Sequence, residues 1–298
     1  MRRKIFFIIN PISGGNKYVN IMMRVLEHTL RKNQCDYDVS FTKYAGHATE
    51  LAKIAQDKNY DVVAAVGGDG TVNEVARSLI NTSVSLGIIP RGSGDGLARG
   101  LSIPLWLRRA ANVLCTGSPR RIDAGKIDER VFFATAGMGF DAVVGKLFNE
   151  GSSRGPLPYF YISAKEFFTY EPKEYILRFN DREIIVKALI LAAANTNQFG
   201  NGAMIGPMAQ PDDGLLDICI LKNISALKAI RHLPKLFTGK LIKTDFYEFY
   251  KTRELTIIRP CKAPIHVDGE AIDGDTHLHL SILPAVLSVI VPTNNHQT

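Results

Sequence analysis

The sequence of 298 residues contains no apolar run long enough to cross a membrane, because a spanning helix needs roughly 18 apolar residues in succession. Its four cysteines are scattered and form no C-x-x-C pair, which is typical of free thiols in a reducing compartment. Residues 1–10 are too short for a secretory signal and lack a small-residue cleavage site, so we expect a first strand there. Together these absences favour a cytoplasmic protein.

Two common phosphate-binding signatures are also missing. No glycine is followed by four residues and then Gly-Lys-Ser or Gly-Lys-Thr, which excludes a P-loop. The dinucleotide pattern G-x-G-x-x-G is approached at Gly68 and Gly70, but Asn73 stands where its last glycine would be. A nucleotide site in this chain would therefore use a different loop.

The composition is that of an ordinary globular protein, with 46% hydrophobic and 22% charged residues. The length suggests two domains of about 150 residues each. The formal net charge of +7 suggests an anionic partner, which can be a nucleotide, a nucleic acid or an acidic membrane surface. The charge alone does not choose among them.

Three Gly-rich segments each follow a predicted strand. Residues 67–74, Gly-Gly-Asp-Gly-Thr-Val-Asn-Glu, lie between the apolar run 60–65 and a predicted helix, and residues 10–16 and 91–99 follow the strands 5–9 and 84–90. Glycine permits positive φ and close backbone approach, and a helix N-terminus attracts anions. Strands alternate with helices up to about residue 117, which predicts a doubly wound parallel sheet with ligands at its carboxyl edge. The three segments can then meet at one nucleotide.

From residue 121 the pattern changes to short strands with turn signals, which indicates a β-sandwich. A hairpin is expected around Asp128, and helices are expected at 19–32, 49–57, 140–148 and 159–170. The later strands are predicted at 175–179, 183–194, 215–221, 246–250, 254–259, 265–267, 276–282 and 285–291. The domain boundary is expected near residue 120.

The motifs resemble the catalytic superfamily of diacylglycerol kinases, which includes bacterial soluble lipid kinases and sphingosine kinases. Its G-G-D-G-T-x-N-E signature stands at 67–74, N-P-x-S-G-G at 10–15 and T-x₃-G-H-A at 42–48. The segment 91–99 departs from the family's pattern, because Asp95 stands where Asn is usual and Gly96 stands where Asp or Ala is usual. The resemblance implies an α/β nucleotide-binding domain of the NAD kinase or diacylglycerol kinase type (1–120), a β-sandwich lipid domain (121–284), a strand at about 285–292 that returns to the first domain, and an active site in the interdomain cleft.

The resemblance also implies site residues. Asp69 would organise a cluster of Mg²⁺ and phosphate, and Glu270, in the Asp-Gly-Glu element 268–270, would be the general base. A Mg²⁺ ion would be held by the Asp213 side chain and the carbonyls of Gln210 and Leu215. Both Asp-Gly segments also suit ordinary turns, and His47 suits a helix N-terminus. The expected nucleotide contacts are Asn10, Pro11, Ser13, Gly14, Thr42, Gly67, Gly68, Asp69, Gly70, Thr71, Asn73, Glu74, Ser93 and Asp95.

The sequence thus predicts a lipid kinase that uses ATP and Mg²⁺ and acts on a membrane lipid such as diacylglycerol or a sphingoid base. It would work peripherally at the inner face of the membrane, without nucleic acid, and a homodimer is left open. Apolar residues of 227–241 line one helix face and basic residues of 228–235 another, a pattern that suits a membrane interface or, slightly better, a solvated charged face. The alternatives are an NAD kinase-type phosphotransferase and a non-catalytic nucleotide- or lipid-binding regulator.

Overall fold

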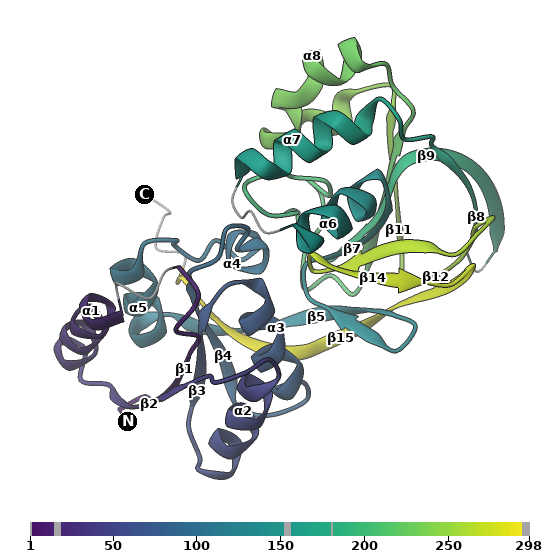
Figure 1. The fold of residues 1–298 in the computed structure, drawn as a ribbon. Coiled ribbons are helices and arrows are strands. Elements are labelled where there is room, and N and C mark those ends of the chain that lie inside the picture. Colours follow the sequence, from purple (N-terminus) through teal and green to yellow (C-terminus); the bar gives the residue numbers. More distant parts are fainter. Residues whose placement is uncertain (1, 15–18, 152–155, 180, 294–298) are drawn as a thin grey trace, which may run out of the picture. The chain divides into compact units, whose positions relative to one another are not determined.

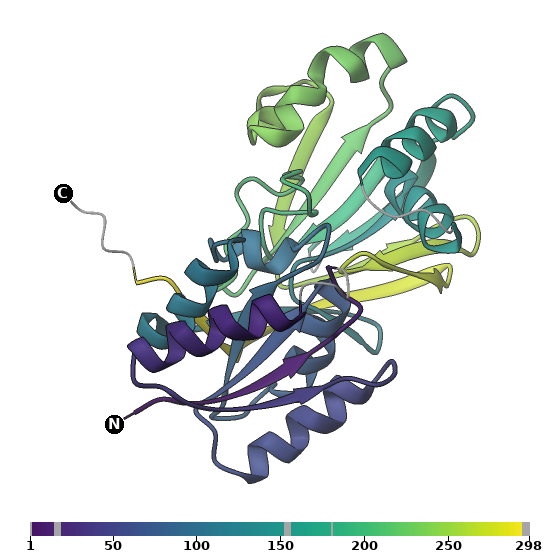
Figure 2. The same cartoon turned by 60° about the vertical axis from the view of Figure 1, so that its left-hand side comes forward.

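A computed structural model describes residues 2–14, 19–151, 156–179 and 181–293. It divides the chain into two compact units (Figures 1 and 2): one holds residues up to Ile122 and the segment from Ala285 onward, and the other holds Asp123–Pro284. None of the described helices is both long enough and apolar enough to cross a membrane.

The first unit is a parallel sheet in the order β15-β4-β3-β1-β2. Its strands are β1 (Lys4–Ile9), β2 (Asp36–Phe41), β3 (Val62–Gly67), β4 (Ser85–Pro90) and the end of β15 (His277–Val291). Every residue of β3 and β4 is buried, because strands covered on both faces carry continuous apolar runs. The predicted doubly wound parallel sheet is therefore confirmed.

Helices connect these strands in sequence. They are α1 (Val19–Lys32), α2 (His47–Asp57), α3 (Asp69–Ser78), α4 (Gly96–Gly100) and α5 (Leu107–Thr116). Helix α1 packs beside α5 and α2 packs beside α3, and the two pairs cover opposite faces of the sheet (Figure 1). The α1 bounds agree with the predicted helix, whose buried residues Met22, Leu26 and Leu30 follow the helical repeat.

The second unit is antiparallel, in the order β14-β13-β7-β9-β8-β12-β15, with β10 and β11 extending from β9. Its strands are β5 (Ser118–Ile127, beginning in the first unit), β6 (Arg130–Phe132), β7 (Thr135–Gly139), β8 (Lys173–Phe179), β9 (Arg182–Ala194), β10 (Leu216–Lys222), β11 (Tyr247–Thr252), β12 (Glu254–Ile258), β13 (Ala263–Val267) and β14 (Glu270–Gly274). Its helices are α6 (Phe140–Glu150), α7 (Pro156–Phe167) and α8 (Ala226–Phe237). Two apolar clusters form its core.

Two predicted elements differ from the structure. The strands expected at 276–282 and 285–291 are one strand, β15, in which Ala285 has a positive φ of 52°. Pro284 interrupts the sequence pattern without ending the strand. Helix α8 ends at Phe237, and Leu241 is buried in a separate 3₁₀ helix, Lys240–Lys243, so Leu241 does not continue the apolar face of α8.

Candidate functional site

The turn between β3 and α3 is tight on one side and open on the other. None of its three glycines has a positive φ, so of the two properties that glycine offers, this turn does not use the left-handed backbone. Close approach explains two of them, because a Cβ on Gly67 would lie 2.6 Å from Thr71 Oγ1 and one on Gly68 would lie 3.1 Å from the Cα of Gly92. A Cβ on Gly70 would meet no atom of the described residues within 4 Å. The turn therefore presents open space at Gly70, in the first turn of α3.

Asp69 joins this turn to the one after β4. Its Oδ1 accepts a hydrogen bond from the Gly96 N–H at 2.8 Å, and its Oδ2 accepts one from the Asp95 N–H at 3.0 Å. Burial raises the pKa of Asp69, and these two N–H donors partly oppose that rise. The carboxylate thus positions the second Gly-rich loop.

Asp95 plays a similar part within its own loop. It is buried, its backbone is left-handed with φ 48°, and its Oδ1 accepts a hydrogen bond from the Gly92 N–H at 2.9 Å. Burial raises the pKa of Asp95 to about 6, and the nearby Asp69 carboxylate adds to the rise. Asp69 and Asp95, which were both predicted to contact the nucleotide, therefore hold the turns after β3 and β4 in place through hydrogen bonds.

The loop after β1 is attached to the same turn. Asn10 Nδ2 donates to Thr71 Oγ1 at 3.1 Å, and Asn10 Oδ1 accepts from the Ile12 N–H at 3.1 Å. Gly14 has φ 71°, and a Cβ there would lie 2.9 Å from Arg91 Nε. Arg91, the first residue of the segment 91–99, thus places a cation beside the first loop. It was not among the predicted site residues, although its place directly after a buried strand was a usable signal. Gly15 and Asn16 lie outside the described residues.

The remaining predicted nucleotide residues differ in their surroundings. Glu74 accepts hydrogen bonds from the N–H groups of Gly46 (3.0 Å) and Ala48 (3.2 Å), so it caps the start of α2. Asn73 is buried, and its side chain makes no hydrogen bond with the described residues. Thr42 is half-buried, Pro11 and Ser13 are half-buried in the first loop, and Ser93 is exposed. His47 begins α2, as expected.

In the second unit, Asp268 and Glu270 have different roles. Asp268 (φ 50°) and Gly269 (φ 83°) form a two-residue turn between β13 and β14, the conformation that tight hairpins favour. The Asp268 carboxylate accepts hydrogen bonds from the N–H groups of residues 133, 134 and 135 at 2.8, 2.8 and 2.9 Å. Glu270 is exposed, and its side chain has no hydrogen-bond or ion-pair partner among the described residues. Its carboxylate is therefore available to a substrate.

The predicted metal ligand Asp213 already has a cation beside it. Its Oδ1 accepts from the Leu215 N–H at 3.0 Å, and Lys251 Nζ lies 2.8 Å from its Oδ2. Mg²⁺ requires a shell of oxygen ligands, whereas here the Lys251 ammonium group pairs with the only carboxylate of the predicted site. In the described part of the chain, no group of three or more His, Cys, Asp or Glu could hold a metal. Lys251 thus supplies the positive charge beside Asp213, and the Mg²⁺ site of Gln210, Asp213 and Leu215 stays a prediction.

A buried pair that the sequence did not reveal supports the Asp268–Glu270 hairpin. His266 Nε2 lies 2.8 Å from Asp141 Oδ2, and their side chains are only 9% and 7% exposed. His266 belongs to β13 and Asp141 to the first turn of α6. A separation of 125 residues gives no local signal for such a pair. The contact fixes β13, and with it the strand that leads into the hairpin, against α6.

Comparisons with known proteins agree with these features. Residues 4–127 match the diacylglycerol kinase catalytic domain, and residues 134–291 match the YegS C-terminal NAD kinase beta sandwich-like domain, which bears out the predicted fold class. A diacylglycerol kinase of Mycobacterium tuberculosis is 30% identical over 302 residues, covering 97% of this chain and 95% of that protein. One from Bacillus subtilis is 28% identical over 274 residues, 88% of each. A solved diacylglycerol kinase structure from Bacillus anthracis has the same fold, with a TM-score of 0.74, 19% identity and 97% of both chains covered. The chain therefore belongs to the diacylglycerol kinase catalytic family and carries the YegS-type β-sandwich domain after it.

Proposed function

We propose that this chain is a lipid kinase that transfers the γ-phosphoryl group of ATP to the hydroxyl of a membrane lipid, of the diacylglycerol or sphingoid-base kind. The observation that carries the proposal is the turn at 67–74. It combines the family signature, open space at Gly70 and a helix N-terminus, and two other loops are hydrogen-bonded to it. Helix N-termini and backbone N–H groups suit phosphate. Relatives named diacylglycerol kinases support the choice of a lipid acceptor.

In this proposal the first unit holds the nucleotide. Asp69 and Asp95 keep the β3–α3 and β4–α4 turns in place before ATP arrives, so binding costs little loop ordering. Arg91 supplies a positive charge beside the first loop, and Asn73 offers a side-chain amide that has no hydrogen-bond partner among the described residues. ATP would enter as its Mg²⁺ complex, so that the ion comes with the substrate.

Glu270 would act on the acceptor. The lipid hydroxyl oxygen attacks the γ-phosphorus, the bond from that phosphorus to the β–γ bridging oxygen breaks, and ADP leaves. The hydroxyl proton passes to the Glu270 carboxylate as the new bond forms. An exposed carboxylate on a tight hairpin, with no competing donor among the described residues, suits this role. Asp268 holds the hairpin and leaves Glu270 to the substrate.

Helix α8 supports peripheral attachment to a membrane. It has no buried residue, and Leu227 and Ile230 are 79% and 69% exposed. Lys228, Arg231 and Lys235 lie on the same helix. A helix with exposed apolar residues and a basic face suits the boundary between acyl chains and water, whereas a merely solvated helix would not leave large apolar side chains uncovered. A cytoplasmic protein at the inner membrane face would meet anionic lipids there.

One assay separates this proposal from its alternatives. Incubation with γ-labelled ATP and a total lipid extract, followed by chromatography, should give a labelled lipid. Label transferred to NAD in a lipid-free reaction would instead indicate an NAD kinase-type enzyme. Tight ATP binding with no transfer to either acceptor would contradict the kinase proposal and favour a regulator.

A further inference from the structure

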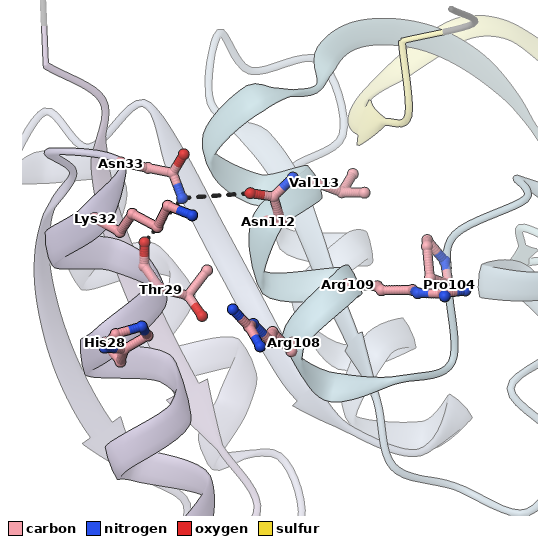
Figure 3. Close-up of a pocket in the computed structure, with 9 residues that line it drawn as sticks. All are labelled: His28, Thr29, Lys32, Asn33, Pro104, Arg108, Arg109, Asn112 and Val113. Carbon is pink, nitrogen blue, oxygen red and sulfur yellow. Dashed lines mark hydrogen bonds between the residues drawn. The ribbon is translucent and has the colours of Figure 1, made fainter. Parts of the chain in front are cut away.

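A basic pocket lies between α1 and α5 in the first unit. Its volume is about 520 Å³, and none of its lining residues belongs to the three Gly-rich loops. Figure 3 shows Lys32 of α1 and Arg108 of α5 reaching into the gap between the two helices. A hydrogen bond of 3.3 Å between Asn33 and Asn112 links the helices at this gap. The lining residues are His28, Thr29, Lys32, Asn33, Pro104, Arg108, Arg109, Asn112 and Val113.

The residues that line the pocket carry positive charge and no negative charge. Lys32, Arg108, Arg109 and the titratable His28 line it, and no acidic residue does. Within the described residues, none of these four side chains has a hydrogen-bond or ion-pair partner. Cations gathered in this way repel one another. An anion in the pocket would convert that repulsion into attraction.

The dipole of α5 is an independent reason to expect an anion in this pocket. Arg108 and Arg109 lie in the first turn of this helix, which contains no acidic residue. The N-terminus of a helix is its positive end, so basic side chains there oppose folding. The two arginines thus carry a cost in the free protein that a bound phosphate would remove.

The residues before Arg108 indicate where the anion comes from. Trp106 is 77% exposed and Leu105 is 39% exposed. Tryptophan is enriched where membrane meets water, because its ring is apolar and its N–H is polar. A site for a soluble anion would gain nothing from large apolar side chains at its edge, whereas a site for a lipid headgroup would.

We propose that the α1–α5 pocket binds the phosphate headgroup of an anionic membrane lipid, with Leu105 and Trp106 placed at the interface beside it. The site is separate from the nucleotide loops and from Glu270, and it does not depend on the kinase proposal. It would hold the first unit to the membrane surface, in addition to any contact made by α8.

The chain provides its own probe, because Trp106 is the only tryptophan in the sequence. Its fluorescence should shift to the blue on titration with vesicles of phosphatidylcholine and phosphatidylglycerol, and should stay unchanged with phosphatidylcholine alone. The double variant Arg108→Gln/Arg109→Gln should need roughly 30-fold more lipid, since each basic residue near an anionic surface contributes about fivefold. Its Tm should be equal or higher, because two charges that oppose the helix dipole are gone.

The control variant Lys53→Gln/Lys58→Gln makes the same change of charge on and just after α2, where both residues are exposed. It should keep nearly all of the vesicle affinity and the full shift. Equal losses in both variants would show an effect of net charge alone and overturn the proposal. So would a missing blue shift on titration with the anionic vesicles, and a Tm raised by millimolar inorganic phosphate in that case would mark a soluble-anion site.

Discussion

The ammonium group of Lys251 lies 2.8 Å from a carboxylate oxygen of Asp213. It also lies 2.8 Å from an oxygen of Asp217, whose side chain is only 2% exposed. Register explains the second contact, because β10 pairs with β11 so that Asp217 stands opposite Lys251. A lysine therefore provides the positive charge at the turn where the resemblance implied a magnesium ion.

Lys251→Met should make this turn depend on a divalent cation. The substitution leaves the buried Asp217 carboxylate unpaired, and removing one partner of a buried pair costs about 3–5 kcal/mol. Lys251 is 32% exposed, so we expect about 1–3 kcal/mol, and Mg²⁺ should restore part of it. Thermal unfolding in EDTA and in Mg²⁺, followed by circular dichroism, measures both effects.

The exposed pair Lys262–Asp275 is a suitable control, since Lys262→Met should cost about 0–1 kcal/mol and show no Mg²⁺ effect. The wild-type Tm should be nearly the same in EDTA and Mg²⁺. A wild-type protein stabilised by Mg²⁺ as strongly as the variant would show that Asp213 binds the ion natively.

Substitution by alanine should lower the stability of the protein at Gly92 but not at Gly70. A Cβ on Gly92 would lie 2.7 Å from the Cα of Gly68, so the two turns must move apart, at a cost of about 1–3 kcal/mol. Gly70→Ala adds its methyl group to open space, and alanine favours the helix. Its stability should be kept while ATP affinity falls, because the methyl group occupies the proposed phosphate position. Calorimetric titration with ATP measures the affinity, and a thermal melt measures the stability. If Gly70→Ala bound ATP as tightly as the wild type, the phosphate would not lie at this turn.

Asp95 should make stability depend on pH. Its pKa is about 6 in the folded chain, against an ordinary value of 3.8, so between these values the folded chain keeps a proton that the unfolded chain has lost. This contribution to stability is fully present below pH 3.8 and is lost as the pH rises through about 6. Asp95→Asn should flatten that fall. Urea unfolding of both proteins across this range gives the two slopes, and parallel slopes would contradict the assignment.

The sequence was sufficient to predict the elements that a pattern of neighbouring residues determines. Helix Val19–Lys32 follows from its apolar repeat and β3 from its continuous apolar run. Pattern also located the Gly-rich turns and the hairpin at Asp268. The partners of the polar side chains could not be predicted, because they depend on pairing across the fold. Asp268 binds backbone that lies 133 to 135 residues away.

The motif residues illustrate this limit. A signature identifies which positions matter, but it does not say whether a side chain faces a ligand or another loop. Asp69 and Glu74 lie in the same signature, and both carboxylates accept hydrogen bonds from backbone N–H groups of other loops. Their contacts with a nucleotide stay predictions. The role of Lys251 depends on strand register, which no local pattern records.

Asp268 and Glu270 should separate stability from catalysis. Asp268→Asn removes the charge that accepts three backbone N–H groups, and hydrogen bonds to a charged group contribute about 1.5–3 kcal/mol each. An amide oxygen can still accept some of them, so we expect the free energy of unfolding to fall by about 1–3 kcal/mol. Activity should decline mainly through loss of folded protein, and stabilising conditions such as low temperature should recover it.

Glu270→Gln should do the reverse. Its side chain makes no hydrogen bond or ion pair with the described residues, so the amide changes no protein contact and the Tm should stay within a degree or two of the wild-type value. The amide cannot accept the hydroxyl proton, and general-base contributions are typically about 10²–10⁴-fold. Turnover at saturating lipid should fall by that factor, while ATP affinity is unchanged. Near-normal turnover in Glu270→Gln would mean that the hairpin is only a turn, and the base would then have to be sought at Asp69 or Asp95.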